Sequence, residues 1–148
     1  MERSVPFGPY TELDEIYVRH AMSADKVSCA RDTELHRVAE IMSREGTHSV
    51  LVEPEEGKTR GEDWGVISDR DLVAAYFKPH APAWTVASTP GATINENARL
   101  LRALRQMSEH DTAHLIVVDD HDNAIGVLST VELIDVMGDL SEADSDAE

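Results

Sequence analysis

Cysteine is almost absent from this chain of 148 residues, which contains only Cys29. One thiol cannot form an intrachain disulfide, and it cannot supply the set of thiolates that a structural zinc site needs. Such sparse use of cysteine is typical of a reducing compartment. We expect Cys29 to be a small, buried apolar residue.

Long apolar runs are also missing, since none approaches the roughly 18 to 20 residues that a membrane-spanning helix requires. The first six residues do not have the charged and then apolar layout of a secretory signal. These two absences predict a cytoplasmic location and no membrane partner.

Basic residues are scarce, because 13 lysines and arginines stand against 29 acidic residues and leave a formal net charge of -16. This field repels a phosphate backbone, so the composition argues against nucleic acid as a partner. Only Lys26, Lys58 and Lys78 are lysines. An acidic, lysine-poor surface is typical of a salt-adapted organism or a GC-rich genome, although a simply soluble acidic protein has the same charges.

Catalytic and metal-binding motifs are not found. No serine lies in a G-x-S-x-G turn, and Cys29 has no histidine close to it in sequence, so we expect no catalytic residue and no enzyme activity. The seven histidines include no H-E-x-x-H motif, which predicts no metal site and no cofactor.

An internal repeat organises the chain, because its two halves match when one is shifted by 65 residues along the other. Residues 35–42 and 100–107 both place apolar side chains at the i, i+3, i+4 and i+7 positions of an amphipathic helix. The apolar runs 50–52 and 115–117 follow these helices, and each predicts a buried strand.

A second match, with a shift of 61 residues, relates the strand that ends at Ser68 to the strand that ends at Ser129. An acidic residue follows three positions later in both halves, Asp71 in the first and Glu132 in the second. This spacing is the capping box that begins a helix. Each half is therefore predicted to be a βαββα unit, and the chain to have an α/β (α+β) fold.

The predicted organisation has five segments. They are a lead-in segment over 1–20 with a short helix near Thr11–Ala21, a first unit over 21–78, a proline-rich linker over 79–91, a second unit over 92–140 and an acidic, disordered tail over 141–148.

The doubled unit, with a strand and helix start reading Gly-Val-Ile-Ser-Asp-Arg-Asp-Leu over 65–72, resembles a pair of CBS domains, named for the regulatory region of cystathionine beta-synthase. The resemblance covers residues 21–140. It implies that the two units pack with pseudo-twofold symmetry and that adenosine ligands lie in clefts between them.

The resemblance also implies roles for the four capping residues. Ser68 would contact the ribose or phosphate and Asp71 the ribose hydroxyls, with Ser129 and Glu132 as their counterparts. The chemistry is reasonable, because a carboxylate in the first turn of a helix can accept two hydrogen bonds from a diol while the helix start favours an anion. Capping boxes also occur without any ligand, and the longer side chain of Glu132 predicts that the first site binds more tightly.

The remaining candidates would surround the base and the phosphate. Ile67 in the first unit, together with the small residues Val27 and Ala92 before the first strands, is expected to provide apolar walls for a planar base. Arg70 and Arg31 are the candidates that could neutralise a phosphate group.

The function implied is a regulatory sensor of energy state or metabolites that binds AMP, ADP, ATP or S-adenosylmethionine. Ligand binding would change the affinity for a regulated enzyme or transporter. We also expect a homodimer that forms through the apolar stripes of 72–77 and 133–137. The alternative is a scaffold with an empty cleft that serves only dimerisation or protein interaction.

Overall fold

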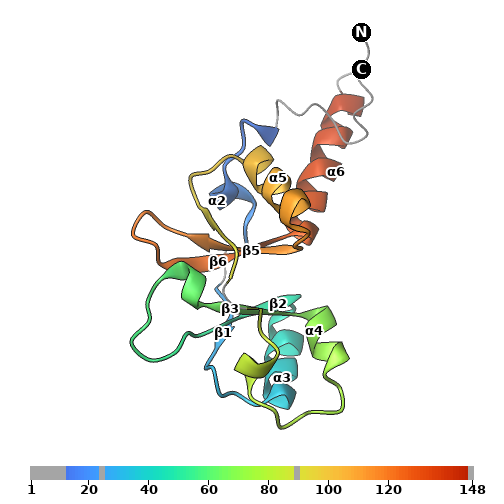
Figure 1. Cartoon of the computed structure of the whole chain (residues 1–148). Helices are drawn as coiled ribbons and strands as arrows, with labels where there is room; N and C mark the ends of the chain where they lie inside the picture. The colour runs from blue at the N-terminus through green and yellow to red at the C-terminus, as the bar shows by residue number, and fades with distance from the viewer. Residues whose placement is uncertain (1–12, 24–25, 89–90, 147–148) are drawn as a thin grey trace.

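Two small sheets, each with its own helices, form the molecule (Figure 1). The computed structural model describes residues 13–23, 26–88 and 91–146. In the first sheet the order is β1-β2-β3, and in the second it is β4-β5-β6. The strands are β1 (Ser28–Cys29), β2 (Ser49–Val52), β3 (Gly65–Ser68), β4 (Thr93–Asn95), β5 (His114–Val118) and β6 (Ala124–Ser129).

The two sheets have the same topology. In both, the first strand pairs parallel to the second, and the second pairs antiparallel to the third. The helices of the described residues are α2 (Val18–Ala21), α3 (Leu35–Glu45), α4 (Asp69–Ala74), α5 (Leu100–His110) and α6 (Thr130–Asp146), with short 3-10 turns at Gly61–Asp63 and Ala83–Thr85. The predicted pair of βαββα units is confirmed.

Helices α3 and α5 form where the apolar spacing predicts them. Each buries one face, through Leu35, Val38 and Met42 in α3 and Leu100, Ala103 and Met107 in α5. Both end at a residue with a left-handed backbone, Gly46 with a φ of 65° and Asp111 with a φ of 49°. The end of each helix thus turns the chain directly into the central strand of its sheet.

Helix α6 corrects one expectation about the C-terminus. It continues to Asp146, whereas the acidic composition predicts disorder from Ser141 onward. The capping residues before α6 start the helix, and no proline or glycine occurs after Gly138 to end it. The last two residues of the predicted tail lie outside the described part of the chain.

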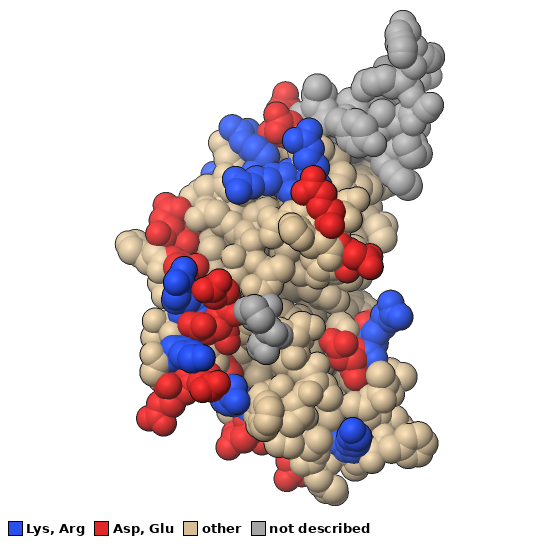
Figure 2. Space-filling model, in the orientation of Figure 1, with Lys and Arg blue, Asp and Glu red and all other residues tan. Residues whose placement is uncertain are grey.

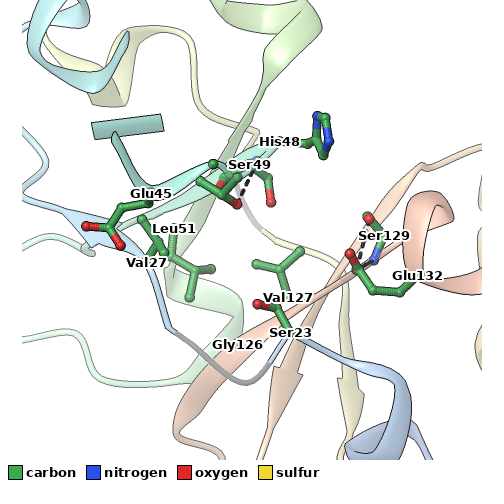
Figure 3. Close-up of a pocket in the computed structure, with 12 residues that line it drawn as sticks. Ser23, Val27, Glu45, His48, Ser49, Leu51, Gly126, Val127, Ser129 and Glu132 are labelled. Atoms are coloured by element: carbon green, nitrogen blue, oxygen red, sulfur yellow. Dashed lines mark hydrogen bonds between the residues drawn. The ribbon is translucent and has the colours of Figure 1, made fainter. Parts of the chain in front are cut away.

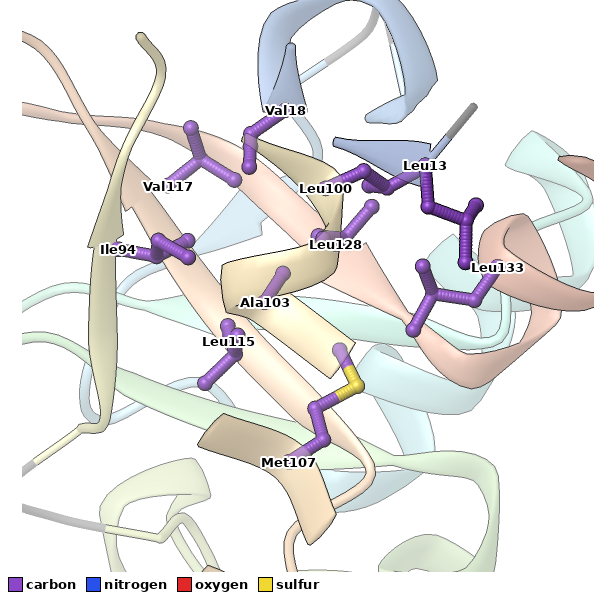
Figure 4. Packing of buried hydrophobic residues seen from close by; sticks show 10 residues of the cluster. All are labelled: Leu13, Val18, Ile94, Leu100, Ala103, Met107, Leu115, Val117, Leu128 and Leu133. Carbon is purple, nitrogen blue, oxygen red and sulfur yellow. The ribbon is translucent and has the colours of Figure 1, made fainter. Parts of the chain in front are cut away.

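The lead-in segment belongs to the second unit rather than standing before the first. Val18 is fully buried in the core of the second unit, beside Leu100 and Leu128 (Figure 4). The Val18 amide donates a hydrogen bond to the Ala98 carbonyl at 2.9 Å, and the Leu100 amide donates to the Ile16 carbonyl at 2.7 Å. Of the predicted helix over 11–21, residues 18–21 form α2, and residues 11–12 lie outside the described residues.

The predicted linker is likewise part of a core, that of the first unit. Ala83 is fully buried there, and its amide donates to the Thr33 carbonyl at 2.7 Å. The Leu35 amide donates to the Ala81 carbonyl at 3.0 Å. Each unit is therefore covered by the segment that precedes the other unit. Burial of apolar side chains such as Val18 stabilises this arrangement.

A third apolar cluster joins the two sheets face to face. It contains Leu51 and Val66 from the first sheet and Ile116, Val118 and Ala124 from the second. Because side chains alternate along a strand, their neighbours in sequence point the other way, toward the helices of their own unit. Both faces of each sheet are therefore buried, one against helices and one against the other sheet.

No described helix combines the length and the apolar character that crossing a membrane would need.

Replacing Val18 by alanine tests the packing of the lead-in segment. Val18→Ala should lower the free energy of unfolding by roughly 2 kcal/mol, because it removes two buried methyl groups from a filled core. The matched control is Val73→Ala, at a valine whose exposed fraction is 75%. Urea unfolding would contradict this packing if both variants lost the same small amount of stability.

Candidate functional site

A cleft of about 150 Å³ lies between the two units (Figure 3). One wall comes from the turn after α3 and the start of β2, and the other from β6 and the first turn of α6. The residues that line the cleft are Ser23, Val27, Glu45, Gly46, Thr47, His48, Ser49, Leu51, Gly126, Val127, Ser129 and Glu132.

Ser129 and Glu132 form the polar corner of this cleft. Strand β6 ends at Ser129, and its amide donates a hydrogen bond to Glu132 Oε1 at 2.7 Å. The Ser129 hydroxyl donates to the same oxygen at 2.9 Å and accepts from the Val131 amide at 3.2 Å. Within the described part of the chain, no hydrogen bond ends on Glu132 Oε2, so this oxygen keeps its capacity to accept from a ligand.

The opposite wall is a tight turn that the backbone holds in place. Gly46 adopts the left-handed conformation that ends α3. The Thr47 hydroxyl then donates to the Ser49 carbonyl at 3.0 Å and orients the start of β2. The apolar side chains of Val27, Leu51 and Val127 also line the cleft, so its surface combines a few polar groups with an apolar wall.

Gly126 allows the segment that joins the lead-in helix to the first unit to pass close to β6. A Cβ atom at this position would lie 2.5 Å from Met22 Cε and 3.5 Å from the Ser23 carbonyl oxygen. A larger residue would therefore require the end of the Met22 side chain to move, next to Ser23 of the cleft lining.

The charges at the cleft are mostly negative. Glu45 and Glu132 line it, and no described lining residue is a lysine or an arginine. The one basic side chain, His48, lies with Nδ1 3.4 Å from Asp69 Oδ2, so a further carboxylate is close by. Across the face drawn in Figure 2, acidic and basic side chains lie close together rather than in separate patches.

Ser68 and Asp71 make the reciprocal capping box that their spacing predicts. The Ser68 amide donates to Asp71 Oδ2 at 2.9 Å, and the Asp71 amide donates to the Ser68 hydroxyl at 3.1 Å. They begin α4 as Ser129 and Glu132 begin α6, but they do not line the cleft described above. The structure thus brings together Val27, Ser129 and Glu132 at the cleft, whereas Ser68 and Asp71 begin α4 outside its lining.

Three other predicted residues lie away from this cleft. Ile67 has no exposed surface and packs in the core of the first unit, so the expectation that its side chain walls a ligand is wrong; Val66 is the β3 residue that faces the other sheet. Arg70 is exposed beside Val73, outside the cleft. Ala92 is exposed just before β4, and its carbonyl accepts a hydrogen bond from the Ile116 amide. Its counterpart Val27 accepts from the Leu51 amide in the same way.

Cys29 is buried, as its sequence context predicts. Burial raises the pKa of its thiol to about 11, so the group stays protonated at neutral pH. A protonated, buried thiol is not a nucleophile.

His114, which the sequence did not single out, is a half-buried histidine beside Ser129 of the cleft lining. It is the first residue of β5 and pairs with Ser129. Burial lowers its pKa, while the charges of Asp71, Asp69 and Glu132 oppose this shift and His48 adds slightly to it. The repeat could not reveal His114, because the matching position of the first unit is a serine. It lies within electrostatic range of both capping carboxylates, Asp71 and Glu132.

Comparison with known proteins identifies the fold and the family. The sequence profile of the CBS domain matches residues 18–78 and 85–139, so the chain belongs to the CBS domain family as a tandem pair. None of the curated proteins matches this chain.

Solved structures of CBS proteins share the architecture. The CBS domain protein PAE2072 from Pyrobaculum aerophilum, complexed with AMP, has a TM-score of 0.71 at 20% identity over 86% of this chain and 99% of its own. The CBS domain pair of protein MJ0100, in complex with 5'-methylthioadenosine and S-adenosyl-L-methionine, has a TM-score of 0.70 at 17% identity over 82% and 99%. The hexameric CBS-CP12 protein from bloom-forming cyanobacteria has a TM-score of 0.71 at 14% identity. The match covers 80% of this chain and 66% of that protein.

The lowered pKa of His114 makes stability depend on pH. Because its folded pKa lies below its ordinary value of 6.5, the unfolded chain binds a proton first as the pH falls, and stability is lost below pH 6.5. His114→Gln should reduce this loss. The carboxyl groups of Glu34, Glu40 and Asp119 have lowered pKa values, so their protonation affects stability only at more acidic pH.

Urea unfolding between pH 7.5 and pH 5.5 measures this effect, with His110→Gln at an exposed histidine as the control. Equal pH slopes for the parent and His114→Gln would rule out this role for His114.

Proposed function

We propose that this CBS pair is a regulatory module that binds a small adenosine-containing ligand in the cleft between its units. The observation that carries the proposal is the cleft itself, in which an acceptor at the start of α6 faces a tight turn of the other unit across an apolar wall. This combination suits a ribose joined to a planar base.

Each part of an adenosine ligand has a matching part in the cleft. Glu132 Oε2 accepts hydrogen bonds from the ribose hydroxyls, while Oε1 stays bound to Ser129 and holds the side chain in place. Val27, Leu51 and Val127 contact the base. The ligand therefore touches both units at once.

The size of the cleft connects binding to regulation. Its volume of about 150 Å³ is smaller than the roughly 300 Å³ at which pockets for drug-sized ligands begin. A nucleoside must therefore either remain partly exposed or separate the two walls. A ligand that separates the walls binds one arrangement of the units better than the other, and this difference shifts the population that a partner enzyme or transporter recognises.

The negative charges of the cleft favour some adenosine ligands over others. Glu45 and Glu132 repel a polyphosphate, and neither Arg70 nor any other arginine or lysine is among the described residues that line the cleft. A neutral nucleoside, or an adenosyl ligand with a positive sulfonium such as S-adenosylmethionine, does not meet this repulsion. We therefore propose these ligands ahead of AMP, ADP and ATP on the charge of the cleft alone, since the MJ0100 pair is in complex with 5'-methylthioadenosine and S-adenosyl-L-methionine but PAE2072 is complexed with AMP.

A second candidate function, assembly into a homodimer, is favoured by the exposed apolar side chains of α4, of the turn that follows it and of α6. The exposed fractions are 75% for Val73, 74% for Tyr76, 89% for Phe77 and 64% for Ile134. Both helices lie on the same side of the molecule (Figure 1). Leu133, also part of the predicted stripe, is instead buried in the core of the second unit.

Calorimetric titration with S-adenosylmethionine, 5'-methylthioadenosine and ATP tests the ligand proposal. We expect the first two to bind more tightly than ATP. Glu132→Ala should weaken binding about tenfold or more, since a hydrogen bond to a charged group contributes roughly 1.5 to 3 kcal/mol. Asp71→Ala is the matched control, because it removes the equivalent carboxylate from the other capping box.

The variants also decide between the two capping boxes. If Asp71→Ala loses the ligand and Glu132→Ala keeps it, the ranking that the sequence predicted is right and the site proposed here is wrong. If none of the three ligands binds, the scaffold function is favoured.

Light scattering in high salt tests the dimer, because salt screens the repulsion between two strongly acidic chains. The mass should be twice the 16.3 kDa of one chain. Phe77→Ser should shift it toward one chain mass, whereas His110→Ser, an exposed change at the end of α5, should not. A monomeric parent protein would contradict the prediction.

A further inference from the structure

Three potential metal ligands meet on the first unit, away from the cleft. Glu34 precedes α3, His36 lies in its first turn, and His80 comes from the segment after α4. Glu34 Oε1 lies 3.0 Å from His36 Nε2 and 2.7 Å from His80 Nδ1. The two imidazole rings are 5.4 Å apart between centroids, with planes at 71°.

The distances suit a single bound ion. One ligand atom from each residue lies within 4.8 Å of the others. Around a tetrahedral zinc ion with bonds of about 2.0 to 2.1 Å, ligand atoms lie roughly 3.3 to 3.4 Å apart. Small rotations of exposed side chains are enough to reach that geometry.

The backbone holds the two segments together before any ion arrives. The His36 amide donates to the Pro79 carbonyl at 2.9 Å, and the Leu35 amide donates to the Ala81 carbonyl at 3.0 Å. Glu34 and Pro82 form a further β-bridge. Because hydrogen bonds on both sides of His80 fix its segment against α3, binding an ion requires little ordering of the chain.

We propose that Glu34, His36 and His80 form a binding site for a divalent transition-metal ion of the zinc, cobalt or nickel class. Two imidazoles and one carboxylate are the ligands that these ions take in proteins, whereas magnesium and calcium prefer oxygen ligands alone. With three protein ligands, water completes the coordination. The exposed fractions of the three side chains, 47% for Glu34, 50% for His36 and 80% for His80, leave room for that water and for entry of the ion.

A bound ion would have a structural consequence that the nucleotide cleft does not share. It would tie the segment 79–82 to the start of α3, and that segment leads into the second unit. The ion would therefore stabilise the first unit and the connection between the two units.

The test uses the full chain without a histidine tag, freed of metal by a chelator. Titration with Zn²⁺ should show one ion bound per chain and a rise in melting temperature, and Mg²⁺ at the same concentration should give neither. His80→Ala should weaken Zn²⁺ binding about tenfold or more, and Glu34→Gln should also weaken it. His110→Ala, which removes an exposed histidine from the second unit, should bind Zn²⁺ like the parent.

The proposal is overturned if titrating the parent with a large excess of Zn²⁺ gives no heat of binding and no change in melting temperature. It is equally overturned if His80→Ala binds Zn²⁺ as the parent does, or if His110→Ala loses binding to the same extent. Far-UV circular dichroism confirms that each variant is folded, which the exposure of all three residues favours. Adenosine ligands play no part in this measurement, so its result is independent of the cleft.

Discussion

The contact between the two sheets is the interaction on which the rest of the structure depends. Leu51 and Val66 on one side, and Ile116 and Val118 on the other, would be exposed if the units separated. Burying each large side chain stabilises the structure by roughly 1.5 to 3 kcal/mol, so separating the two sheets would be costly. The cleft lies at the edge of this contact, and its walls are placed by the same packing.

The crossed covering of the units adds a second constraint. The lead-in segment closes the core of the second unit through Val18, and the segment before the second unit closes the core of the first through Ala83. A ligand that moves one unit relative to the other must also strain these covering segments.

Local charges decide the chemistry of the cleft more directly than the large net charge of the chain. Exposed charges more than about 10 Å apart are largely screened at moderate salt, so most of the acidic surface has little influence on a bound ligand. Glu45 and Glu132 line the cleft itself and act at short range. Outside it, exposed Glu34 acts on two histidines in the same short-range way.

The sequence by itself determined the repeat, the order of helices and strands, and the capping residues Ser129 and Glu132, because periodicity and capping depend on residues a few positions apart. Only the tertiary structure decided which face of each strand is turned toward the other unit. Ile67, which we expected beside a ligand, packs in the core of the first unit. The tertiary structure alone placed His114 beside Ser129 and brought His80 to the start of α3. These features depend on packing between segments far apart in the chain, and no local pattern of residues records which distant segment will bury a given apolar face.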